Sequence, residues 1–79
     1  MFVVYIIYSH TIDRFYVGST QNLDDRMKRH NSGRSKYTKR GMPWVIITTF
    51  ELASRPEAVR LEKKIKKRGI KRYLSDIEI

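Results

Sequence analysis

The sequence predicts a single α+β domain over residues 1–79, in which a small three-stranded antiparallel sheet is flanked by about three helices. Two observations predict this class: three short segments are rich in β-branched and aromatic residues, and three others carry helix caps or helical apolar spacing. A chain of 79 residues has room for one domain. The predicted order, strand, strand, helix, strand, helix, helix, is typical of an α+β fold.

Three segments are predicted to form the strands. The run FVVYIIY, residues 2–8, is continuously apolar, so we expect a strand at the centre of the sheet with both faces covered. The polar segment SHTID follows, and RFYVG, residues 14–18, is predicted to return as the second strand of a hairpin. An assumed register in which opposed residue numbers sum to 21 places Tyr5 opposite Tyr16 on one side of the sheet. The third predicted strand is WVIITTF, residues 44–50.

The first predicted helix begins after the second strand. Asn22 is a favoured N-cap, and Asp24 and Asp25 follow it in the first turn, where negative charge suits the helix dipole. Gly33 is expected to end this helix. Residues 33–43 then contain glycine, proline and four basic side chains, so a surface loop is predicted there.

Two more helices are predicted after the third strand. Ser54 and Glu57 form a capping-box pattern with Pro56 in the first turn, and the helix that follows is expected to run to about Gly69. A short third helix is predicted from apolar residues at helical spacing: Ile70, Tyr73, Leu74 and Ile77.

The charge of the chain indicates a polyanionic partner. Lys and Arg number 17 against 8 Asp and Glu, which gives a formal net charge of +9, and nucleic acid is the first partner this suggests. The longest apolar run is too short to span a bilayer and no secretory signal is visible, so a cytoplasmic protein without a membrane partner is expected. Cysteine is absent, which leaves oxygen or imidazole as metal ligands.

Helical geometry singles out Glu62 on the second predicted helix. At 100° per residue, Glu62 falls about 40° from Ala58, inside the apolar sector. Four basic residues project from the opposite face: Arg60, Lys63, Lys64 and Lys67. We therefore do not expect the carboxylate to be one half of a solvated i,i+4 ion pair on that face. Two explanations stay open: an inward ion pair or hydrogen bond with Arg26, Tyr5 or Tyr16, or a hard divalent cation such as Mg²⁺.

Arg26 and His30 border the buried stripe of the first predicted helix, whereas Lys28 and Arg29 point away from it. Both have ordinary structural explanations, a histidine satisfied by a backbone carbonyl and an arginine whose stem is buried while its head reaches water. Gly18 at the end of its strand allows close backbone approach, by a ligand or merely within a turn.

Basic and aromatic residues elsewhere could contact a nucleic acid. The loop cations Arg34, Lys36, Lys39 and Arg40, with the run KKIKKRGIKR, are either a solvated surface or a phosphate-contacting one. Tyr37, Trp44 and Tyr73 could stack on bases, although Trp44 at a strand start suits the core better. No glycine-rich phosphate loop and no zinc-type spacing is present.

Four stretches together resemble the small stand-alone members of the GIY-YIG nuclease superfamily: VVYIIYS, FYVGSTQNLDDRMKRHNSG, KYTKRGMPWVI and SRPEAVRLEKKIKK. The resemblance covers residues 3 to about 68. The two signature triplets of the family correspond to VYI, residues 4–6, and YVG, residues 16–18. Val4 replaces the first glycine of the family pattern, and Val17 replaces an isoleucine.

The resemblance implies the fold of that family and five catalytic positions: Tyr5, Tyr16, Arg26, His30 and Glu62. Arg26 matches the catalytic arginine and Glu62 the metal-binding glutamate. The implied activity is endonucleolytic hydrolysis of DNA with Mg²⁺ or Mn²⁺ and low intrinsic sequence specificity. Tyr5 or Tyr16 would take the proton from water, and the sequence does not decide between them.

Two other functions stay open. A basic nucleic-acid-binding module without catalysis would use Glu62 and Arg26 as a structural pair, and its binding would depend on salt but not on Mg²⁺. An accessory subunit that docks on an acidic protein would form a stoichiometric complex and would bind DNA negligibly. The shape of the DNA substrate, linear or branched, and the oligomeric state are not determined by the sequence.

Overall fold

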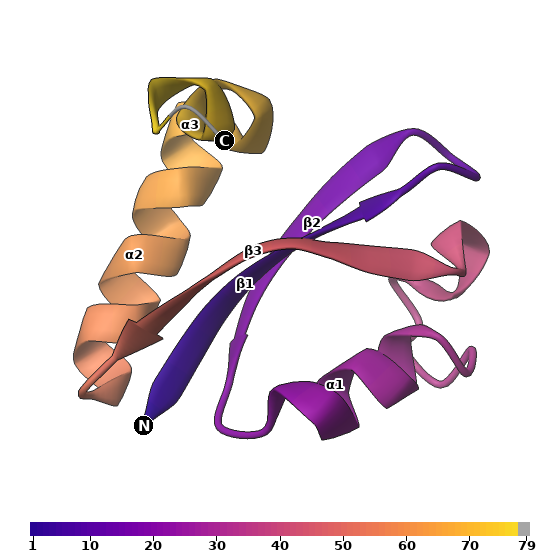
Figure 1. Cartoon of the computed structure of the whole chain (residues 1–79), viewed down its shortest axis with the longest axis horizontal. Helices are drawn as coiled ribbons and strands as arrows, with labels where there is room; N and C mark the ends of the chain where they lie inside the picture. Colours follow the sequence, from indigo (N-terminus) through magenta and orange to yellow (C-terminus); the bar gives the residue numbers. More distant parts are fainter. Residues whose placement is uncertain (78–79) are drawn as a thin grey trace.

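A computed structural model describes residues 1–77 of the chain. Its elements follow in the order β1 (Phe2–Ser9), β2 (Arg14–Thr20), α1 (Leu23–His30), a 3₁₀ turn (Lys39–Gly41), β3 (Trp44–Leu52), α2 (Arg55–Arg68) and α3 (Ile70–Asp76), as Figure 1 shows. The predicted α+β class and the order of its elements are confirmed. No helix within the described residues is long and apolar enough to cross a bilayer.

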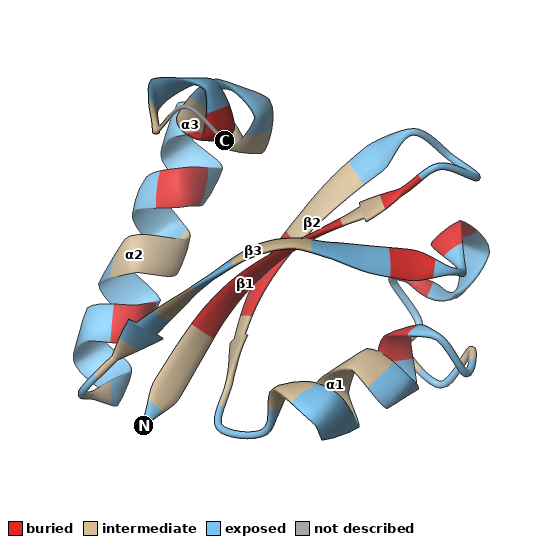
Figure 2. Ribbon diagram, viewed as in Figure 1, coloured by how far each residue is buried: buried red, intermediate tan, exposed pale blue. Residues whose placement is uncertain are grey.

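The strand β1 lies at the centre of the sheet, in the order β2-β1-β3, and pairs antiparallel with both neighbours. Its middle residues are fully buried (Figure 2), because helices cover both faces of the sheet. Val4 and Ile6 pack with residues of α2 and α3, whereas Tyr5 and Ile7 pack toward α1. The alternation of the strand therefore sends Tyr5 to the α1 face.

The predicted register of the hairpin is wrong by two residues. Tyr5 lies opposite Gly18, and Tyr16 lies opposite Ile7. The cause is the turn: the strands close at the pair of Ser9 and Arg14, so four residues connect them, and Asp13 adopts a left-handed conformation with φ of 51°. A shift of two residues keeps each side chain on its face, so Tyr5 and Tyr16 still share one side of the sheet.

The helix caps agree with the sequence, except at the end of α1. Asn22 caps α1 by accepting a hydrogen bond from the Asp25 amide, and Ser54 caps α2 in a complete capping box. However, α1 ends at His30 and not at Gly33. Asn31 diverts the chain there, because its side chain makes two hydrogen bonds to the backbone of Trp44, of 2.6 and 3.1 Å.

Candidate active site

Tyr5 is linked to α1 through a buried chain of hydrogen bonds. Its hydroxyl lies 2.8 Å from His30 Nε2, and His30 Nδ1 lies 2.8 Å from Thr38 Oγ1. All three side chains are buried. His30 reaches Tyr5 because it is the last residue of α1, on the side that packs against the sheet. Thr38 was not predicted, and its polar surroundings in the sequence do not distinguish it from its exposed neighbour Tyr37.

Burial sets the protonation states of this chain. It raises the pKa of Tyr5 to about 12, although the adjacent Arg26 guanidinium acts in the opposite direction. Burial, helped by the positive charge of Arg26, lowers the pKa of His30. Tyr5 is therefore protonated and His30 neutral at pH 7. Since a neutral imidazole has one N–H, His30 donates to one hydroxyl and accepts from the other, which fixes the orientation of its ring.

The stability of the fold is expected to fall as the pH drops below about 6.5. The pKa of His30 is lowered in the folded protein, so the unfolded chain binds the proton first. The free energy of unfolding is therefore unaffected by His30 above the pKa of this side chain in the unfolded chain. It decreases as the pH falls from there through the pKa of His30 in the folded protein, by at most about 1.4 kcal/mol per pH unit. Thermal unfolding across this pH range measures the effect.

The other histidine provides the control. The chain has two histidines, and His10 is exposed beside the β1–β2 turn. In His10→Asn protein, the remaining imidazole signal in a proton NMR titration belongs to His30 and should titrate below about pH 6.5. A midpoint at or above that value would contradict the proposed buried, neutral state.

Gly18 is required by the packing of Tyr5. A Cβ atom at this position would lie 2.6 Å from the Tyr5 hydroxyl oxygen and 2.8 Å from the adjacent ring carbon. The space over the glycine is therefore occupied by the tyrosine that lies opposite it in the register. Gly18 is buried, and the Tyr5 ring covers it. The predicted direct contact of Gly18 with a substrate is therefore not supported.

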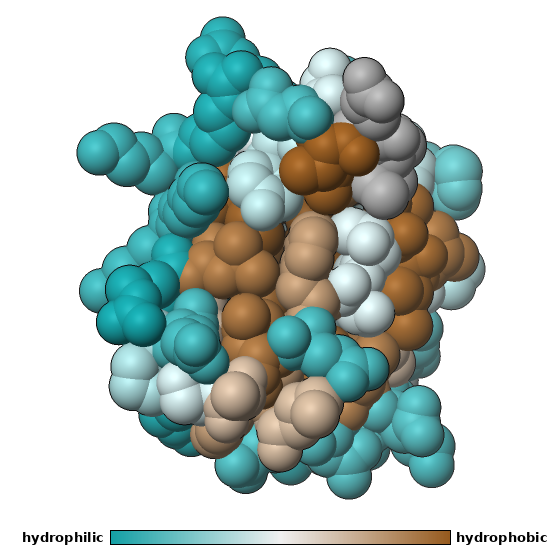
Figure 3. All heavy atoms as spheres, turned by 60° about the vertical axis from the view of Figure 1, so that its left-hand side comes forward, coloured by the Kyte–Doolittle hydropathy of each residue, from teal (hydrophilic) through white to brown (hydrophobic). Residues whose placement is uncertain are grey.

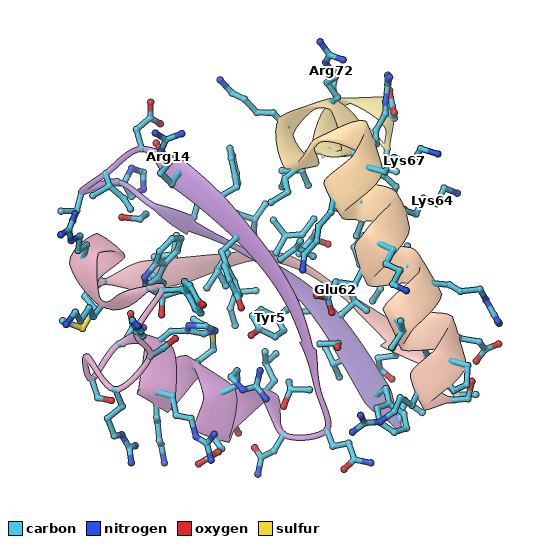
Figure 4. The ribbon with its side chains drawn as sticks, turned by 180° about the vertical axis from the view of Figure 1, so that it is seen from behind. Tyr5, Arg14, Glu62, Lys64, Lys67 and Arg72 are labelled. Atoms are coloured by element: carbon cyan, nitrogen blue, oxygen red, sulfur yellow. The ribbon has the colours of Figure 1, made fainter. Side chains whose placement is uncertain are left out.

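Glu62 reaches the site from the other face of the sheet, at the edge strand β2. Ser19 Oγ donates a hydrogen bond to Glu62 Oε1 at 3.0 Å, and Arg26 Nη1 donates to the Ser19 carbonyl at 3.5 Å. One residue of β2 thus contacts α2 through its side chain and α1 through its backbone. Figure 4 shows Tyr5 and Glu62 on the two sides of the β2 ribbon.

The ion-pair partner of Glu62 differs from the prediction. Neither Arg26 nor a tyrosine pairs with it directly; Lys66 Nζ lies 2.8 Å from Glu62 Oε2. The carboxylate is half of an i,i+4 pair, but not with a cation of the opposite face: Lys66 follows Glu62 by four residues and so lies on the same side of α2. The contact with Glu62 raises the pKa of Lys66. The Glu62 side chain retains 22% exposure, so the carboxylate is accessible from solvent.

The donor set fits a cation that is shared with a substrate. No group of three or more His, Asp or Glu residues positioned to hold a metal occurs within residues 1–77, so a closed structural metal site is not supported there. Mg²⁺ commonly binds through one or two carboxylates and completes its shell with water and substrate phosphate. Glu62, with two carboxylate oxygens at an accessible strand edge, meets that requirement.

Two pockets meet at Arg26. The larger one, of about 370 Å³, lies between β2 and the starts of α1 and α2, and Ser19 and Arg55 help to line it. The smaller one, of about 210 Å³, is lined by Tyr16, His30 and three arginines: Arg26, Arg29 and Arg34. Arginine donors arranged around a pocket suit a phosphate, whose oxygens accept charge-assisted hydrogen bonds.

The structure brings together some of the predicted substrate-contacting residues and not others. Arg34 lines the smaller pocket with Tyr16. Three further cations of that segment, Lys36, Lys39 and Arg40, are exposed, and Tyr37 is exposed by 85%. By contrast, Trp44 is buried, so its ring is not free to stack on a base. Tyr73 is half-buried and packs edge-on against Phe50 at a centroid distance of 6.2 Å.

Residues 1–73 match the family model described as the GIY-YIG catalytic domain. The chain belongs to the GIY-YIG family. All five predicted catalytic positions lie within the matched segment. This family assignment indicates a nuclease-type domain, with nucleic acid as the general class of substrate.

Proteins similar to this GIY-YIG chain occur in several bacteria. A UPF0213 protein of Staphylococcus haemolyticus is 38% identical over 64 residues, which cover 80% of this chain and 78% of that protein. A UPF0213 protein of Halalkalibacterium halodurans is 38% identical over 53 residues, which cover 66% of this chain and 56% of that protein, just over half of its length. A solution NMR structure of a UPF0213 protein from Bacillus halodurans superposes with a TM-score of 0.61 and 30% identity, covering 99% of this chain and 84% of the other. The predicted fold is thereby confirmed.

Proposed function

We propose that this GIY-YIG protein is an endonuclease that hydrolyses DNA phosphodiester bonds with low intrinsic sequence specificity and depends on Mg²⁺ or Mn²⁺. The supporting observation is the arrangement at Ser19, which Glu62 contacts from α2 and Arg26 from α1. A carboxylate suited to a cation and a guanidinium suited to a phosphate thus flank one strand edge. Glu62 is the residue that would hold the cation, which would neutralise charge on the scissile phosphate and the leaving oxygen.

Arg26 is the phosphate-binding residue in this proposal. It lines both pockets, so its guanidinium can donate to a phosphate in either. Its hydrogen bond to the Ser19 carbonyl is long, at 3.5 Å, and leaves other N–H groups available. A donor of this kind, directed at an oxygen whose negative charge increases in the transition state, contributes about 3 kcal/mol in other enzymes.

The two tyrosines have different roles in the proposed mechanism. Tyr16 is half-buried and lines the pocket that contains the three arginines, so its hydroxyl can exchange a proton with water beside a bound phosphate. Tyr5 is fully buried, with a pKa raised to about 12. We therefore assign proton transfer from the attacking water to the phenolate form of Tyr16, which would have released its own proton to solvent before the attack. We assign Tyr5 and His30 to positioning the wall of that pocket.

A nucleic-acid-binding module without catalysis is the second candidate. The observation that favours it is the 2.8 Å ion pair of Glu62 with Lys66, which gives the carboxylate a structural partner. In that case the charge of +9 would provide salt-sensitive affinity for DNA, independent of divalent cations.

Cleavage of supercoiled plasmid separates the two candidates. The nuclease is expected to produce nicked plasmid with Mg²⁺ or Mn²⁺ and none with EDTA, as measured on agarose gels over time. A Glu62→Gln protein purified in parallel controls for contaminating nucleases. Salt-sensitive DNA binding with no cleavage in either metal would support the binding module instead.

A further inference from the structure

Helices α2 and α3 carry most of the positive charge of the chain, and part of it lies on their outer surface. Residues 55–76 contain nine Lys and Arg against three Asp and Glu, an excess of six within a net charge of +9. Hydrophilic side chains project along this side of the molecule next to an apolar band, as Figure 3 shows. The cleavage mechanism proposed above uses none of the cations on this outer surface.

Four of these side chains gather in one place. Lys64, Lys67, Arg68 and Arg72 line a surface pocket of about 370 Å³. Since α-helices have 3.6 residues per turn, Lys64 and Lys67 lie about 160° and 140° around α2 from Glu62. They project away from Tyr5 and Glu62, in the direction that Figure 4 shows, together with Arg72 on α3. The pocket is therefore a surface separate from the candidate active site.

Most of the charge in this pocket has no acidic partner among residues 1–77. Arg68 pairs with Asp76 through two hydrogen bonds, of 2.7 and 3.0 Å, which hold α3 against α2. Within residues 1–77, Lys64, Lys67 and Arg72 form no ion pair with a carboxylate. All four lining residues are cationic, so the complementary ligand is a polyanion with repeated charges, as in a nucleic-acid backbone.

We propose that Lys64, Lys67 and Arg72 bind the phosphate backbone of a second duplex arm of a branched DNA. The first arm would lie at Tyr16, Arg26 and Glu62, and this placement rests on the proposed nuclease function. The protein measures 28 × 25 × 18 Å. The persistence length of duplex DNA is far greater, about 500 Å or about 150 base pairs. A linear duplex is thus stiff on this scale and cannot contact opposite sides of α2, whereas two arms of a branch point can.

A binding experiment in EDTA tests this surface without requiring cleavage. Fluorescence anisotropy would compare the wild type, Lys67→Gln/Arg72→Gln and the matched control Arg14→Gln/Lys28→Gln on a four-way junction and on a linear duplex with the same arm sequence. Each double variant removes one lysine and one arginine. Arg14 and Lys28 are exposed and lie outside both proposed DNA surfaces.

For the junction, the slope of log K against log salt concentration is expected to be smaller in magnitude by about 1.8 in the Lys67→Gln/Arg72→Gln protein, because two phosphate contacts are lost. If the binding of the two proteins becomes equal near 1 M salt, this corresponds to about 60-fold weaker binding of the variant in about 0.1 M salt. Its slope for the linear duplex should change by much less, because the duplex can still use the active-site surface. Equal losses in both double variants, or equal losses on both DNAs, would overturn the proposal. Absence of plasmid cleavage would instead contradict the nuclease function. The binding experiment in EDTA would still test whether Lys67 and Arg72 contact a second arm.

Discussion

Glu62→Gln protein is expected to nick supercoiled plasmid about 10³-fold more slowly than the wild type in Mg²⁺. The substitution keeps the size of the side chain and an oxygen that can accept the hydrogen bond from Ser19 Oγ. It removes the negative charge that a divalent cation requires and that now pairs with Lys66. The fold should persist, because the Lys66 partner is exposed, and an i,i+4 ion pair that reaches the solvent contributes little to stability.

Glu51→Gln is the matched control for this prediction. Glu51 is an exposed residue of β3, and its substitution changes the net charge by the same amount. This protein should nick plasmid at the wild-type rate. It should also bind Mn²⁺ in the presence of DNA as tightly as the wild type does, as measured by the paramagnetic resonance signal of the free ion. Equal nicking rates in Glu62→Gln, Glu51→Gln and the wild type would contradict the assignment of Glu62 as the metal ligand.

The elements of this fold are largely local in origin, which is why the sequence predicts them. Asn22 and Ser54 begin helices through hydrogen bonds to residues three positions away, and such contacts depend on short sequence patterns. The buried run of β1 indicates its central position in the same way. The hairpin register depends instead on the turn geometry around Asp13, and the expected pairing was displaced by two residues.

The site contains contacts that short patterns do not encode. Thr38 joins His30 across eight positions, and Ser19 joins Glu62 across 43. Both contacts depend on how α1, α2 and the segment before β3 pack on the sheet. Helical geometry and the family resemblance singled out Glu62 as a candidate ligand, and its ion pair with Lys66 has a local i,i+4 spacing. Its link through Ser19 to Arg26 is a result of the three-dimensional fold.

The burial of the two tyrosines likewise depends on packing, and it leads to the second large prediction. Tyr16→Phe protein is expected to cleave DNA about 10²- to 10⁴-fold more slowly than the wild type, the usual contribution of a proton-transferring side chain. Tyr5→Phe should reduce cleavage less than about tenfold but should destabilise the fold by about 1–2 kcal/mol, because it leaves His30 with a buried unpaired nitrogen. Single-turnover cleavage and thermal unfolding measure the two effects.

Each substitution removes one hydroxyl from a tyrosine on the same face of the sheet, so each protein is the control for the other. The environments differ: the Tyr5 hydroxyl is buried against His30, whereas Tyr16 borders the pocket that contains Arg26. A large loss of cleavage in Tyr5→Phe with little effect in Tyr16→Phe would reverse the assigned roles. That result would require the Tyr5 hydroxyl, with its pKa of about 12, to become accessible to water when DNA binds.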